Sequence, residues 1–269
     1  MRIENIDHNL KLLEKSFGGL ADINKYSQTI LTPVVRWSPF IKSWLYTLLH
    51  PNARLRRQND AEHTLGMVML VTNTSLKLQP YNPSLDCFLL TLAATDHEFG
   101  EGILKSDVCY LVKKSDRDRD EYLAFVKRFA VLGGDLMIYH RRAFLLQFAG
   151  IETGDEDNAW EIFPEADRKI LHWLWENRRR EAYIFKYCER LEYILFAIEQ
   201  GCRYRNYIMA EEVLRNHICD MHQACKLIPG WEEKIWTPNI DNLAKEVHKE
   251  LVSCLPPAKL FKPEINRGV

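Results

Sequence analysis

An apolar helix that ends in charged and metal-binding side chains is the feature that most constrains the fold of this chain. The run 85–94 is almost wholly apolar and leads directly into Thr95–Gly102, TDHEFGEG. Because a helix advances about 100° per residue, His97 and Glu101 fall on the face that the apolar run buries, with Glu98 beside them. Imidazoles and carboxylates are costly to bury unless they are paired or coordinated. The fold must therefore bring partners for them from elsewhere in the chain.

The rest of the sequence predicts an all-α protein. No stretch keeps the two-residue alternation of a strand, whereas apolar residues recur at spacings of three and four. Helix starts are expected near Asp60, with Asn59 or Asp60 as the N-cap, and after Ser84. We expect one domain over residues 1–269, with helices at 40–49, 60–76, 85–94, 122–132, 136–148, 164–176, 181–200, 204–227 and 240–254.

The composition excludes several classes of protein. Lys and Arg total 36 against 37 Asp and Glu, so we expect neither a nucleic-acid polymer nor an anionic membrane as a non-specific partner. The seven cysteines are scattered, with no CxxC pair. No apolar run suits a signal peptide or a membrane span. A cytoplasmic protein with reduced cysteines is the expectation.

Two further helices place ligand-type groups on apolar faces. His63 lies in the row His63, Met67, Leu70, and Glu189 interrupts the row Ala182, Phe185, Glu189, Tyr193, Phe196. A single histidine in such a row is usually a core residue, but here three helices share the pattern. Two imidazoles and two carboxylates suit a divalent metal ion. We expect metal ligation by His63, His97, Glu98 and Glu189.

Three stretches resemble the motifs of HD-domain metal-dependent phosphohydrolases, in particular the compact HD-domain 5'-deoxynucleotidases. They are RRQNDAEH at 56–63, HEFGE at 97–101 and EAYIFKYCERLE at 181–192. The resemblance covers roughly residues 30–200. It implies an HD-domain-like helical bundle there, with helical extensions at 1–29 and 201–269.

The resemblance also implies roles for individual residues. Both of the family's metal aspartates are glutamates here, Glu98 and Glu189, and Asp96 is the alternative ligand if the His-Asp pair is inverted. The implied catalytic groups are Glu101 and Asp107, although Asp107 stands one residue later than the family pattern. The implied substrate contacts are Arg56, Arg57, Asn59 and Lys186, where arginine suits two-pronged phosphate binding.

The expected function is release of phosphate from nucleoside or deoxynucleoside phosphates, chiefly 5'-monophosphates, with Mn, Co, Fe, Zn or Mg as the cofactor. A triphosphate hydrolase of the same family is the near neighbour. Two alternatives stay open. One is an HD-type di-iron oxygenase, for which His140 and His172 are the additional candidate ligands. The other is a non-catalytic HD-like module, in which the glutamates mark lost metal binding. The extensions can cover the site or form a homodimer face.

Overall fold

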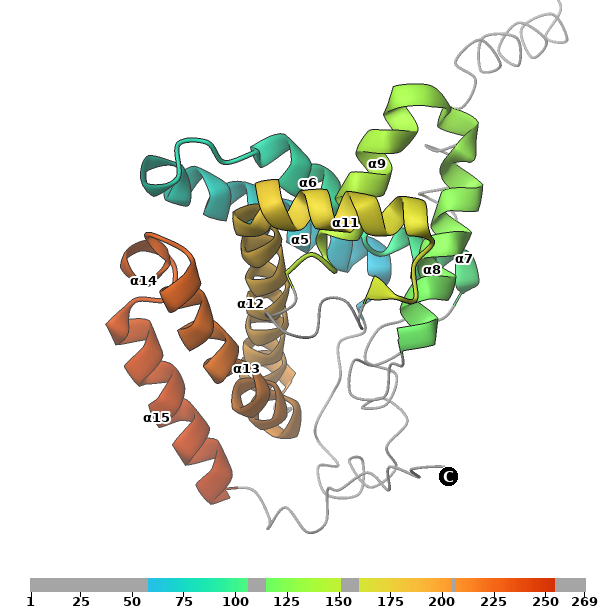
Figure 1. Cartoon of the computed structure of the whole chain (residues 1–269). Helices are drawn as coiled ribbons and strands as arrows, with labels where there is room; N and C mark the ends of the chain where they lie inside the picture. The colour runs from blue at the N-terminus through green and yellow to red at the C-terminus, as the bar shows by residue number, and fades with distance from the viewer. Residues whose placement is uncertain (1–57, 106–114, 151–159, 205–206, 255–269) are drawn as a thin grey trace, which may run out of the picture.

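The computed structural model describes residues 58–105, 115–150, 160–204 and 207–254, which form helices joined by turns, without a β-sheet (Figure 1). The predicted all-α class is confirmed. Residues 1–57, with Arg56 and Arg57, and the segment containing Asp107 lie outside this part of the chain. The α-helices are α5 (Asp60–Leu78), α6 (Cys87–Asp96), α7 (Phe99–Leu104), α8 (Ser115–Phe129), α9 (Gly134–Leu146), α11 (Glu165–Asn177), α12 (Arg179–Tyr204), α13 (Tyr207–Leu227), α14 (Trp231–Lys234) and α15 (Pro238–Cys254). Two short 3₁₀ turns, η1 (Gln79–Tyr81) and η2 (Ala130–Leu132), follow α5 and α8.

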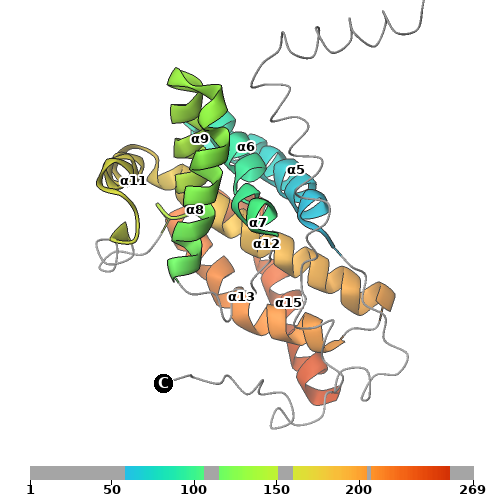
Figure 2. The same cartoon turned by 90° about the vertical axis from the view of Figure 1, so that its right-hand side faces the viewer.

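Helix α12 is the centre of the bundle. It packs against α5, α6 and α11, and along α13 more extensively than any other pair of described helices (Figures 1 and 2). Its apolar row is confirmed as core, because Ala182, Phe185, Tyr193 and Phe196 are all buried. Helix α15 covers the far side of α13, so the order of packing is α5, α12, α13, α15.

The start of α5 places a histidine in the core. The side chain of Asn59 accepts a hydrogen bond from the backbone N–H of Glu62 at 2.9 Å, which confirms the predicted N-cap. His63 then falls in the first turn and is fully buried. The N-cap of α6 is Asp86, which accepts from the backbone N–H of Leu89, and not the predicted Ser84.

The chain turns between α6 and α7, where a continuation of one helix face was expected. Helix α6 ends at Asp96, and α7 begins at Phe99, so His97 and Glu98 form the junction. Helix α7 lies directly on α8 at Gly100, where an added Cβ would come within 2.6 Å of the Cβ of Glu121. Only glycine permits this approach, which fixes the position of α7 and of its carboxylates.

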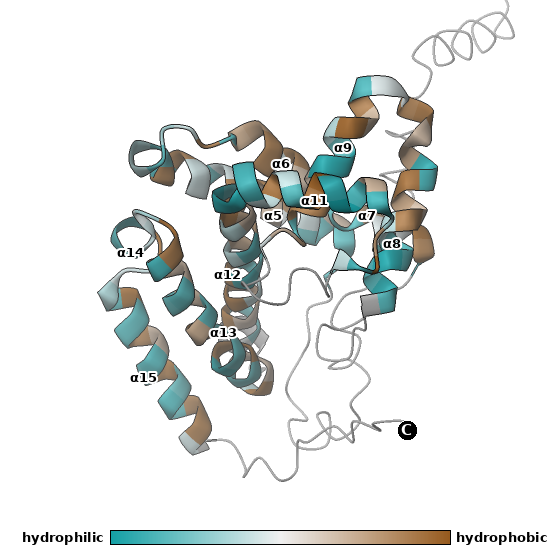
Figure 3. Ribbon diagram, viewed as in Figure 1, coloured by the Kyte–Doolittle hydropathy of each residue, from teal (hydrophilic) through white to brown (hydrophobic). Residues whose placement is uncertain are grey.

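One carboxylate of helix α15 makes several polar contacts. Asp241 of α15 accepts hydrogen bonds from Lys245 at 2.7 Å and from the indole of Trp236 at 3.0 Å, and His222 of α13 contacts the same carboxylate. Hydrophilic and hydrophobic residues are interspersed along α15 (Figure 3). Among the described residues, no helix combines the length and apolar character needed to cross a membrane. The division into a 30–200 core and two extensions stays a prediction.

Candidate metal centre

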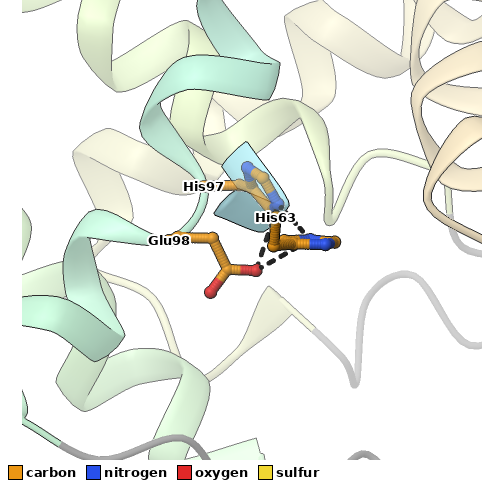
Figure 4. A group of neighbouring side chains, drawn as sticks. All are labelled: His63, His97 and Glu98. Atoms are coloured by element: carbon orange, nitrogen blue, oxygen red, sulfur yellow. Dashed lines mark hydrogen bonds and ion pairs between the residues drawn. The ribbon is translucent and has the colours of Figure 1, made fainter. Parts of the chain in front are cut away.

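Three side chains from two separate regions of the sequence converge in the core (Figure 4). His63 Nε2 lies 3.1 Å from His97 Nε2 and 3.2 Å from Glu98 Oε1, and His97 Nε2 lies 3.1 Å from the same oxygen. All three residues are buried, with relative exposures of 0%, 5% and 4%. Helix α5 supplies one ligand-type atom, and the α6–α7 junction supplies the other two.

The edges of this triangle match a metal coordination sphere. Imidazole nitrogens and carboxylate oxygens bind zinc and similar ions at about 2.0–2.2 Å. Two such atoms are about 3 Å apart when the angle between them at the ion is about 90–100°. The three observed separations of 3.1 to 3.2 Å agree with that value. We therefore assign His63, His97 and Glu98 as the described residues that can hold a divalent ion.

The surroundings of the two Nδ1 atoms bear on this assignment. His97 Nδ1 lies 3.0 Å from the backbone oxygen of Ala94, and His63 Nδ1 lies 3.0 Å from Glu192 Oε2. The oxygen of Ala94 can only accept, so in a neutral His97 ring the proton belongs on Nδ1 and the lone pair on Nε2. The contact of His63 Nδ1 with Glu192 Oε2 does not have the geometry of a hydrogen bond. The Nε2 lone pair of His97 then faces the carboxylate oxygen of Glu98 and the ring of His63 in a buried site. A cation is the partner that makes this arrangement favourable.

A second group of ligand-type atoms lies next to the first. One carboxylate oxygen from each of Asp60, Glu98 and Glu101 lies within 4.8 Å of the other two, and all three residues are buried. Glu98 belongs to both groups, so the predicted acid or base, Glu101, lies beside the predicted metal ligands. Asp60 was not predicted as part of the site. Its place in the first turn of a helix already has an explanation in the helix dipole.

Aromatic side chains of α12 hold the two imidazoles in place. The ring of Tyr193 stacks on His63, with centroids 6.0 Å apart and planes 23° apart. Phe185 meets His97 edge-on, at 5.4 Å and 79°. These contacts limit rotation of both rings about their side-chain bonds, so the two nitrogens keep their direction without help from a bound ligand.

The structure does not bring the fourth predicted ligand into the group. The carboxylate of Glu189 accepts hydrogen bonds from Tyr193 Oη at 3.1 Å and from Arg190 at 3.2 Å. Burial acts to raise the pKa of Glu189, but the neighbouring charge of Arg190 is the main opposing influence, and that pKa lies below its ordinary value. Glu189 is thus near the histidines and ionised, while Glu192, one turn later, is the carboxylate that contacts His63.

The alternative ligands have other partners. Asp96 Oδ2 lies 2.7 Å from His140 Nδ1, and Asp96 belongs to neither group of ligand-type atoms. Burial raises the pKa of the Asp96 carboxyl to about 6, although the hydrogen bond from His140 opposes the shift. His172 is exposed and meets Trp160 edge-on at 5.0 Å. The oxygenase alternative needs His140 and His172 as additional ligands. Neither residue belongs to the groups of ligand-type atoms that contain His63, His97 and Glu98.

The predicted substrate residues are only partly described. The Asn59 side chain serves as the cap of α5. Lys186 is half-buried on α12, with its ammonium 5.5 Å from the ring centroid of Tyr187. Arg56, Arg57 and Asp107 lie outside the described residues, so their roles stay predictions.

Comparison of the chain with protein-family models, with curated proteins and with solved structures finds no match. The assignment of the site therefore depends on its own geometry and on the motif resemblance.

Proposed function

We propose that this chain is a metal-dependent phosphohydrolase that releases phosphate from nucleoside phosphates, with nucleoside 5'-monophosphates as the expected substrates. The observation that carries the proposal is the triangle of His63, His97 and Glu98 at coordination spacing. The three motifs that resemble HD-domain phosphohydrolases had named these residues as metal ligands. Their convergence from two regions of the chain supports the motif assignment.

The chemistry follows from the donor set. When bound, a divalent ion lowers the pKa of a water molecule and neutralises charge on a phosphate group. His63 and His97 offer neutral nitrogens, and Glu98 offers one negative charge, so a divalent ion held by these three ligands would keep one positive charge for contact with a phosphate oxygen. The burial of all three side chains excludes bulk water, which strengthens electrostatic interactions inside the site.

Glu101 is the proposed proton-transfer group. It lies on α7, is 7% exposed, and has a carboxylate oxygen within 4.8 Å of one on Glu98. A carboxylate at that distance can take a proton from a water near the ligands or give one to the leaving oxygen. Arg56 and Arg57 are the proposed phosphate contacts.

The geometry favours this function over the non-catalytic module. A module that had lost metal binding would have no need to keep three ligand atoms within 3.2 Å of one another in a buried site. Each glutamate is one methylene longer than the aspartate of the family pattern. Glu98 nevertheless reaches both histidines.

A nucleotide panel tests the proposal. Mono-, di- and triphosphates are assayed for phosphate release with Mn, Co, Mg and Zn separately, using wild type, His97→Ala and His172→Ala. We expect release from 5'-monophosphates by wild type and by His172→Ala, whose side chain is exposed and outside the site, and none by His97→Ala. A folded, metal-loaded wild-type protein that releases no phosphate from any nucleotide would contradict the proposal.

A further inference from the structure

We propose that His140 of α9 is a positioning residue of the metal centre. Its hydrogen bond to Asp96 fixes the end of α6, and its ring supports the start of α7. The two residues between these points are His97 and Glu98, which are two of the three candidate ligands. The inference rests on the metal centre of the proposed function and concerns what holds its ligands in place.

The hydrogen bond joins a side chain of α9 to the last residue of α6. His140 Nδ1 lies 2.7 Å from Asp96 Oδ2, and the Asp96 side chain is 1% exposed. A buried carboxyl group is unfavourable without a hydrogen-bond partner, so this contact fixes the end of α6 with respect to α9. The contact needs one proton between the two atoms, and either atom can carry it.

The ring of His140 lies next to the aromatic side chains that support α7. Its centroid is 5.3 Å from that of Phe129, the last residue of α8. Phe129 in turn meets Phe99, the first residue of α7, edge-on at 5.0 Å. Both phenylalanines are buried. His140 therefore contacts one side of the α6–α7 junction directly and the other side through one intervening ring.

These contacts enclose the two ligands of the junction. Asp96 stands immediately before His97, and Phe99 stands immediately after Glu98. Helix α9 packs on α6, and α8 packs on α7, so the pair α8 and α9 supports both helices that meet at the junction (Figure 2). The third ligand, His63, belongs to α5. A shift of the junction with respect to α5 would therefore change the separations of 3.1 and 3.2 Å between His63 and the other two ligands.

The backbone of the junction does not by itself fix its place in the bundle. The N–H of His97 donates to the oxygen of Ala93 at 3.1 Å, and the N–H of Gly102 donates to the oxygen of Glu98 at 3.0 Å. Both bonds stay within α6, α7 and the junction between them. The position of the junction relative to α5 thus depends on side-chain contacts with other helices, such as those of His140.

The test separates the hydrogen bond from the ring. His140→Phe keeps an aromatic ring beside Phe129 but has no nitrogen for Asp96, whereas His140→Asn can place an amide N–H where Nδ1 lies but has no ring. His222→Phe is the matched control. His222 of α13 also contacts a carboxylate of another helix, Asp241 of α15, and neither α13 nor α15 carries a candidate ligand.

Two properties are measured: zinc affinity by chelator competition, and hydrogen exchange of the backbone amides of residues 97–102 in metal-free protein. We expect protected junction amides in the wild type. His140→Phe should weaken zinc binding about 10-fold, the lower end of the usual effect of outer contacts of metal ligands, and should speed exchange at the junction. His140→Asn should restore most of both properties, and His222→Phe should change neither.

Three results would overturn the inference. Unprotected junction amides in the wild type would do so without any variant. Unchanged zinc affinity in folded His140→Phe would do so too, and an equal loss in His222→Phe would show an effect of general stability alone.

The experiment also separates this inference from the proposed function. Neither measurement uses turnover, so a protein that binds zinc as expected but releases no phosphate refutes the proposed function and leaves the role of His140 standing. If the wild type binds no zinc, the proposed function fails, and the exchange data decide on His140. Faster junction exchange in His140→Phe but not in His222→Phe then supports the role, and unchanged exchange refutes it.

Discussion

Asp241 should stabilise the fold in a strongly pH-dependent way. Partial burial acts to raise the pKa of its carboxyl, but hydrogen bonds from Lys245, Trp236 and His222 outweigh burial and lower that pKa from 3.8 to about 2. A carboxyl whose pKa is lower in the folded state contributes stability above its unfolded pKa. That contribution disappears as the pH falls from about 4 to about 2.

The magnitude follows from the shift. At about 1.4 kcal/mol per pKa unit, a shift from 3.8 to about 2 corresponds to about 2 kcal/mol at neutral pH. The side chain of Asp241 is 17% exposed, and solvent screening reduces the figure to about 1–2 kcal/mol. Lys245 of the same helix and Trp236 contribute more to this free energy than His222, so only part of it links α15 to α13.

Urea unfolding followed by circular dichroism measures the effect. Asp241→Asn should lower the free energy of unfolding by about 1–2 kcal/mol at pH 7 and by almost nothing near pH 2. Asp116→Asn is the matched control, because the Asp116 side chain is 75% exposed and its distance to Arg119 is 3.6 Å. Equal stability of Asp241→Asn and wild type at pH 7 would refute the reasoning.

Two further predictions concern the packing of α7 at Gly100 and the separate roles of Glu98 and Glu101. Gly100→Ala should destabilise the protein by about 1–3 kcal/mol, because the new methyl group meets the backbone and Cβ of Glu121; thermal unfolding measures this, and an unchanged midpoint would argue against the close contact. Glu101→Gln should keep metal and substrate affinity but lower turnover about 10²–10⁴-fold, whereas Glu98→Gln should lose metal first. Metal content and turnover are measured in both variants together, and the opposite pattern would exchange the two assignments.

Helix positions could be predicted well because the apolar periodicity is strong. Apolar residues at spacings of three and four predicted the buried faces of α5 and α12. The capping side chain of Asn59 predicted the start of α5. The break between α6 and α7 could not be predicted in the same way. Residues 97 and 98 keep backbone angles in the α region, so the spacing of side chains continues almost as in an unbroken helix.

Some residues of the site could likewise be predicted from the sequence, and others could not. His63 and His97 were predictable because each places an imidazole where an apolar residue belongs, and Glu98 because it follows His97 in a stretch that resembles the family motif. The sequence could not show whether Glu189 or Glu192 contacts His63, because residues three apart lie on nearly the same helix face. Only the packing of α12 on α5 decides which carboxylate contacts His63.

Asp60 was missed for a different physical reason. An acidic residue in the first turn of a helix is favourable on local grounds alone, so its sequence position carries no signal of a distant partner. Its closeness to Glu98 and Glu101 depends on the placement of α7 against α5.

Metal stoichiometry decides whether His63, His97 and Glu98 hold one divalent ion. Wild type, His63→Ala, His97→Ala and the control His172→Ala are loaded with zinc or manganese, dialysed and analysed for metal, with circular dichroism to establish that each is helical. We predict about one ion per chain in wild type and in His172→Ala, and almost none in the other two, because each removes one of three ligands. Undiminished metal in His63→Ala or His97→Ala, or none in folded wild type, would contradict the account.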